Sequence, residues 1–146
     1  MEETVYKEYQ ALITGEYKES VFANTSAFVN EHLHGCNWVG FYFMVDGELK
    51  LGPFQGKVAC YRIKVGKGVC GTAVAQRKAQ LVPDVHKFPG HIACDSSTNS
   101  EIVVPIIVKD EVVGVLDLDS QEFDHFHEEE KNFLERIVEI LIQEVY

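Results

Sequence analysis

The chain has 146 residues, 46% of them hydrophobic, which is enough apolar material for one domain with a single core over residues 1–146. Its net charge of −10 repels phosphate backbones and anionic membranes, so neither nucleic acid nor a membrane is expected as a partner. No apolar run is long enough to cross a bilayer, and the acidic first residues do not resemble a signal peptide. These features predict a cytoplasmic protein.

Two packing helices are expected at the start of the chain. Residues 3–14 place apolar side chains at helical spacing and end at Gly15. Residues 20–33 repeat the amphipathic pattern and end at Gly35.

An aromatic hairpin follows. The β-rich segments 38–45 and 48–54 are joined by Asp46-Gly47, a dipeptide favoured in tight hairpin turns. Trp38 and Tyr42 are four positions apart in the sequence, an even number, so they share one face of the first strand. Such a face forms either ordinary core or the wall of a ligand pocket, and core is the commoner outcome.

The middle of the chain mixes short elements with one long loop. A third strand is expected over residues 58–65 and carries Cys60. Residues 68–76 predict a small-residue helix opened by glycines, whose first backbone N–H groups could meet an anion. After a short strand at 80–82, the loop up to residue 100 is long enough to suggest a binding or catalytic segment.

A second hairpin is predicted from the β-branched segments 101–108 and 112–119. Asp117 and Asp119 are two residues apart and therefore face the same side. They are either ordinary solvated charges or part of a buried site, and the sequence alone favours neither.

The position of Glu101 depends on the register of this hairpin. A two-residue turn at 110–111 would place Glu101 opposite Ser120. Pro105 cannot donate to a ladder and marks a bulge or an edge, and a bulge there would move Glu101 onto the face of the aspartates. We expect the bulge. A final amphipathic helix at 127–146 completes an α+β sandwich, with helices flanking a mainly antiparallel sheet.

The four cysteines contain no C-x-x-C pair, and the six histidines form no metal-binding motif. The histidines are therefore interpreted as surface or helix-start residues. A metal site would require convergence of residues distant in the sequence, and no metal is expected.

Cys94 is the best candidate nucleophile. It lies at the start of a polar loop with His91 three residues upstream, and a neighbouring imidazole or helix terminus would lower the pKa of the thiol. The alternative is an inert, partly buried thiol, which is the commoner state of a single intracellular cysteine.

Several motifs resemble known families. The glycine pattern at 66–71, Val82-Pro83-Asp84 and Leu116-Asp117-Leu118-Asp119-Ser120 are similar to those of GAF domains. More narrowly, the chain resembles the free methionine-(R)-sulfoxide reductases in Asn37-Trp38-Val39-Gly40-Phe41-Tyr42, in the cysteines Cys60, Cys70 and Cys94, and in His91-Ile92-Ala93-Cys94-Asp95. Cys36 has no role in that pattern.

The resemblance implies a pocket that holds one free amino acid. It implies Cys94 as the catalytic cysteine, Cys60 as the resolving one and Cys70 as an auxiliary thiol. Trp38 and Tyr42 would wall the site, and Glu101, Asp117 and Asp119 would form its polar side. Which carboxylate is the acid stays open.

The implied reaction is thiol-dependent reduction of free methionine sulfoxide. Cys94 attacks the sulfoxide sulfur, a carboxylic acid protonates the oxygen, and the resulting sulfenic acid condenses with Cys60. Thioredoxin would reopen that disulfide, so no organic cofactor is expected. A homodimer through the terminal helices is implied by analogy. The alternatives are a ligand-binding GAF sensor without catalysis and a thiol redox sensor.

Overall fold

The computed structural model describes residues 1–91 and 95–146. Its helices are α1 (Glu3–Ile13), α2 (Lys18–His32), α3 (Gly68–Gln76) and α4 (Glu128–Val145), with a 3₁₀ turn, η1, at Val85–Lys87. Its strands are β1 (Cys36–Val45), β2 (Glu48–Gly56), β3 (Arg62–Lys64), β4 (Gln80–Val82), β5 (Ser100–Val108) and β6 (Glu111–Ser120). No helix among these residues is long and apolar enough to span a membrane.

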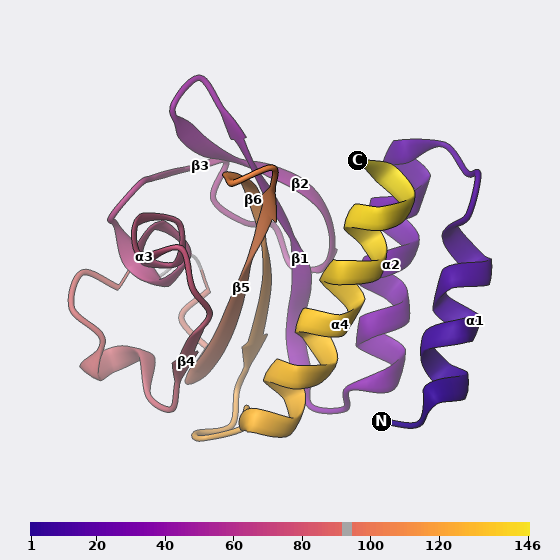
Figure 1. The fold of residues 1–146 in the computed structure, drawn as a ribbon. Coiled ribbons are helices and arrows are strands. Elements are labelled where there is room, and N and C mark those ends of the chain that lie inside the picture. The colour runs from indigo at the N-terminus through magenta and orange to yellow at the C-terminus, as the bar shows by residue number, and fades with distance from the viewer. Residues whose placement is uncertain (92–94) are drawn as a thin grey trace.

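The strands form one antiparallel sheet in the order β3-β2-β1-β6-β5-β4. Helices α2 and α4 pack on one face of this sheet, with α1 on the outer side of these two helices, and α3 lies on the other face (Figure 1). The predicted α+β sandwich is therefore confirmed.

The alternation of side chains along β1 and β6 separates two cores. Phe41, Leu116 and Leu118 face the three helices and are fully buried there. The residues that alternate with them along the strands face α3. On that side Trp38 and Tyr42 belong to a second apolar cluster. Because successive side chains point to opposite faces and both faces are covered, five consecutive residues are buried in the middle of each strand, 38–42 in β1 and 114–118 in β6.

Two tight turns set the register of the hairpins. Asp46 and Gly47 have φ of 53° and 82°, and Lys109 and Asp110 have φ of 49° and 68°. Positive φ at both central residues matches the right-handed twist of the flanking strands. The second turn therefore lies at 109–110, one residue before the expected position.

A bulge after this turn brings Glu101 to the face of the aspartates, as expected. Val108 pairs with Glu111, but the register shifts between Ile106 and Ile107, so Glu101 pairs with Asp119. Without the extra residue Glu101 would oppose Leu118 and face the helices.

The predicted strand at 58–65 is wrong in extent. Only Arg62–Lys64 pairs, against Glu48–Lys50 of β2. Further along β2, after Lys50, Pro53 has no N–H that could pair with a neighbouring strand. Residues 57–61 leave the sheet instead, and Cys60 lies in this loop, which faces the pocket described below.

Replacing Gly71 by alanine is expected to destabilise the fold by about 1–3 kcal/mol, the usual cost of overpacking. A Cβ at this position would lie 2.3 Å from the backbone oxygen of Lys64, which cannot rotate away. Chemical denaturation measures the effect. Ala75→Ser, on the exposed side of the same helix, is the control, and equal stability of the two variants would contradict the close approach.

Candidate active site

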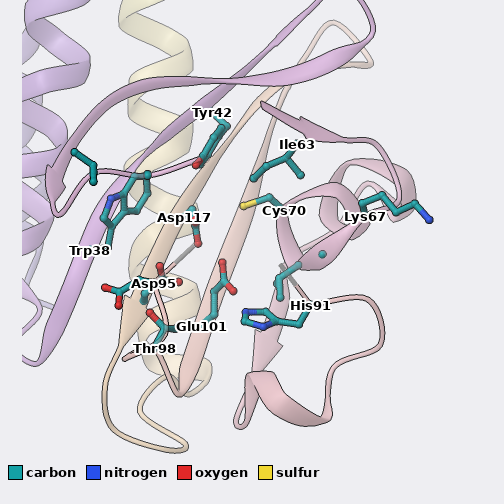
Figure 2. A pocket seen from close by; sticks show the side chains of 15 residues that line it. Trp38, Tyr42, Ile63, Lys67, Cys70, His91, Asp95, Thr98, Glu101 and Asp117 are labelled. Atoms are coloured by element: carbon teal, nitrogen blue, oxygen red, sulfur yellow. The ribbon is translucent and has the colours of Figure 1, made fainter. Parts of the chain in front are cut away.

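A pocket opens between the sheet, the N-terminus of α3 and the 57–61 loop (Figure 2). It encloses about 550 Å³ between its atoms, including the part open to solvent at the mouth. Its walls bring together residues that are distant in the sequence.

Trp38 and Tyr42 form the aromatic wall. The Trp38 ring stacks on Phe54 at 5.1 Å and on Tyr42 at 5.9 Å between centroids. Both side chains are buried, yet both line the cavity, so this face of β1 serves as core and as pocket wall.

The same two side chains fix the loop that carries Cys60. The Trp38 indole N–H donates to the Lys57 carbonyl at 3.1 Å, and the Tyr42 hydroxyl donates to the Cys60 carbonyl at 2.8 Å. These bonds hold the loop over the aromatic wall although no strand pairing does.

Glu101, Asp117 and Asp119 lie side by side on β5 and β6 and face the pocket. Glu101 is 6% exposed and Asp117 is 5% exposed, while Asp119 is half-buried. Of the two alternatives left open for Asp117, the ordinary solvated charge is therefore wrong. Leu116 and Leu118 point to the opposite face, as the alternation predicts.

Burial raises the pKa of all three carboxyl groups. For Glu101 the charges of Asp117 and Asp119 raise the pKa further, and so does hydrogen bonding with these aspartates, because only the protonated form of Glu101 has an O–H to donate. Those bonds oppose the rise of the pKa at Asp117 and at Asp119. Like charges this close cannot all ionise, so Glu101 is the group best placed to keep its proton.

The aspartates retain unused acceptor capacity. Oδ1 of Asp117 and Oδ1 of Asp119 are buried and have no hydrogen-bond partner among the described residues. A buried carboxylate oxygen without a donor is costly, and a bound cation or ammonium group would offset that cost.

The cysteines occupy different environments. Cys36 and Cys70 are free, whereas Cys60 is disulfide-bonded. Cys70 is buried in the pocket wall, where burial first and then the charge of Asp117 raise the pKa of its thiol. Burial, with the charges of Asp119 and Glu130, raises the pKa of Cys36 to about 12. Cys94 lies outside the described residues.

Sequence reasoning missed His91 as a pocket residue. The histidines were expected at the surface or at helix starts, but His91 is half-buried and lines the cavity. Burial, with a smaller effect from the charge of His86, lowers the pKa of His91. Its position in the His91-Ile92-Ala93-Cys94-Asp95 motif was the available signal.

Asp95 and Thr98 also line the pocket and were not singled out as site residues. The Asn37 amide donates to Asp95 Oδ2 at 3.1 Å and to Thr98 Oγ1 at 3.2 Å. Asp95 Oδ1 accepts from the backbone N–H of Ser97 at 2.9 Å. These bonds tie the loop to the first residues of β1, which explains how two segments far apart in sequence share the site.

The start of α3 supplies the opposite polarity. Gly71 is the first residue whose N–H bonds within the helix, to the Lys67 carbonyl at 3.0 Å, so the N–H groups of 68–70 have no partner inside it. Lys67, Gly68 and Val69 line the pocket. The predicted glycine-opened helix is present, and its positive end suits a carboxylate.

The GAF-domain family model matches residues 19–145 of the chain. The chain is 52% identical over 133 residues to the free methionine-R-sulfoxide reductase of Escherichia coli, covering 90% of this chain and 81% of that protein.

Two solved structures share the fold closely. The reduced form of fRMsr of Staphylococcus aureus superposes with a TM-score of 0.94 at 48% identity, covering 98% of this chain and 94% of the other. The Neisseria meningitidis free methionine-R-sulfoxide reductase in complex with its substrate gives 0.92 at 40% identity, covering 96% and 85%. The chain therefore belongs to the GAF-domain family and, within it, to the family of the free methionine-R-sulfoxide reductases.

Proposed function

We propose that this protein reduces free methionine-R-sulfoxide to methionine. The observation that carries the proposal is one pocket with an aromatic wall, a buried acid and two unpartnered aspartate oxygens, in a chain 52% identical to a named reductase. This set of groups matches the apolar methyl, the sulfoxide oxygen and the ammonium of a single small molecule.

The substrate is held at both charged ends. Its ammonium meets the free oxygens of Asp117 and Asp119, and its carboxylate meets the backbone N–H groups at the start of α3. The S-methyl group packs against Trp38. A peptide-bound methionine lacks the free ammonium and carboxylate, so these contacts favour the free amino acid.

The reaction needs a proton on the sulfoxide oxygen, because oxide is a poor leaving group. Glu101 is the proposed donor, since burial and its two acidic neighbours keep it protonated. The Cys94 thiolate attacks the sulfoxide sulfur, and the neutral His91 imidazole is available to take the thiol proton.

The electrons come from two thiols. The attack forms a bond between the Cys94 sulfur and the substrate sulfur. The protonated oxygen then passes as hydroxyl to the Cys94 sulfur, and the bond between the two sulfurs breaks with its electron pair going to methionine, which leaves Cys94 as a sulfenic acid. The Cys60 thiol then attacks this sulfur, expels water and forms a Cys60–Cys94 disulfide. Thioredoxin reduces that disulfide by exchange, in the cytoplasm. The disulfide-bonded state of Cys60 supports a redox role for this cysteine.

A coupled assay tests the proposal. NADPH consumption is followed with thioredoxin and thioredoxin reductase, while the R and S epimers of free methionine sulfoxide and a blocked, peptide-like analogue are offered separately. Turnover confined to the free R epimer is expected. Binding of the sulfoxide without turnover would support a GAF sensor instead, and oxidation by peroxide alone would support a thiol redox sensor.

Replacing Tyr42 by phenylalanine is expected to slow disulfide formation about five- to tenfold, with little change in methionine release. The lost hydrogen bond to the Cys60 carbonyl is worth about 1 kcal/mol, and the loop becomes less well positioned. Trapping of the sulfenic acid with dimedone during a single turnover measures the delay. Tyr61→Phe, on an exposed ring, is the control, and an equal effect of both variants would contradict the positioning role.

A further inference from the structure

Three buried side chains from different elements converge in the pocket. One ligand atom from each of Cys70, Glu101 and Asp117 lies within 4.8 Å of the others. These residues come from α3, β5 and β6, and each is at least nine-tenths buried. This is the long-range convergence that a metal site in this chain requires.

The cluster also lacks a counter-charge. Asp117 Oδ1 is buried, faces the pocket and has no hydrogen-bond partner among the described residues. Lys67 and His91 are the basic side chains among the described lining residues, and neither forms an ion pair with these acids. An uncompensated buried carboxylate favours any cation that can reach it.

We propose that Cys70, Glu101 and Asp117 bind a thiophilic divalent cation, Zn²⁺ being the natural candidate. A thiolate among the donors selects soft or borderline ions over Mg²⁺ and Ca²⁺. Zinc accepts mixed sulfur and carboxylate ligands in tetrahedral geometry, and three protein ligands leave the fourth position for water. On binding, the Cys70 S–H bond and the Glu101 O–H bond are replaced by S–Zn and O–Zn bonds, and both protons pass to solvent, with no change of oxidation state.

The ion would occupy the place that the proposed function gives to the substrate. Asp117 cannot hold the ammonium, nor Glu101 keep its proton, while both ligate a metal. Zinc is therefore a competitive inhibitor of sulfoxide reduction. This inhibition rests on the proposed function, whereas the metal site rests only on the geometry of the three side chains.

Titration of Cd²⁺ into the Cys60→Ser/Cys94→Ser double variant tests the site, because Cys36 and Cys70 are then the only thiols. We expect one equivalent to bind with the ultraviolet absorption of a cadmium–thiolate bond. Adding Cys70→Ser removes the absorption, and adding Cys36→Ser leaves it unchanged. Asp117→Asn, which keeps both thiols, weakens binding by about tenfold or more.

Absence of the absorption in the double variant, or its persistence after Cys70→Ser, overturns the proposal. Circular dichroism shows whether each variant is folded. If the Cys70→Ser variant is unfolded, the weaker binding by Asp117→Asn still tests the site. Free methionine-R-sulfoxide is then added to the Cd²⁺-loaded protein and is expected to displace the ion. Cadmium binding through Cys70 with no binding of the sulfoxide would support the metal site and overturn the proposed function.

Discussion

Replacing Cys94 by serine is expected to lower the rate of methionine-R-sulfoxide reduction by more than about 10³-fold, as loss of a nucleophile does in other covalent enzymes. A serine hydroxyl is hardly ionised near neutral pH and forms no stable analogue of a sulfenic acid, so both steps of the proposed reaction fail. The coupled NADPH assay with the free R epimer measures the loss.

Cys60→Ser separates the two steps. This variant should release one methionine per chain in a single turnover and then stop, because thioredoxin has no disulfide to open. Cys36→Ser is the matched control and should retain full activity, since Cys36 does not line the pocket. Undiminished turnover by Cys94→Ser would refute the proposed chemistry. Steady turnover by Cys60→Ser would show that Cys60 is not the resolving cysteine.

The side-chain alternation was readable from the sequence, because the period of a strand is two. It placed Asp117 and Asp119 on one face of their strand and Trp38 and Tyr42 on one face of theirs. The structure shows in addition that the two faces are on the same side of the sheet. The bulge that turns Glu101 toward the aspartates was predictable only through Pro105, and the turn that precedes it was misplaced by one residue.

Other parts of the site depend on contacts that no local pattern encodes. The path of residues 57–61 is set by hydrogen bonds from Trp38 and Tyr42, which lie nearly twenty residues earlier. The pocket position of His91 depends on the loop that follows β4. Sequence reasoning also left open which carboxyl keeps its proton, because that depends on burial and on distances between strands.

Replacing Glu101 by glutamine is expected to lower turnover by about 10²–10⁴-fold, the usual contribution of a general acid. The amide preserves the shape and can still donate hydrogen bonds to the two aspartates, but it cannot release a proton to the sulfoxide oxygen. Quenched-flow measurement of methionine release in a single turnover isolates this step from recycling.

The same substitution should make the protein more stable at pH 8. The pKa of Glu101 is raised in the folded state, chiefly by burial and then by the charges of Asp117 and Asp119. The unfolded chain releases the Glu101 proton above a pKa of about 4.3, whereas the folded protein keeps it to a higher pH. The stability of the folded protein therefore falls as the pH rises from the unfolded pKa to the folded pKa of Glu101. Glutamine does not ionise and escapes this loss.

The melting temperature of Glu101→Gln should therefore exceed that of the parent at pH 8, and the difference should vanish near pH 4. Glu111→Gln, on an exposed side chain of the paired strand, should show no such difference. A Glu101→Gln protein that is less stable than the parent at pH 8 would mean that the carboxyl group is ionised and favourably paired in the native state, and Glu101 could not then serve as the acid.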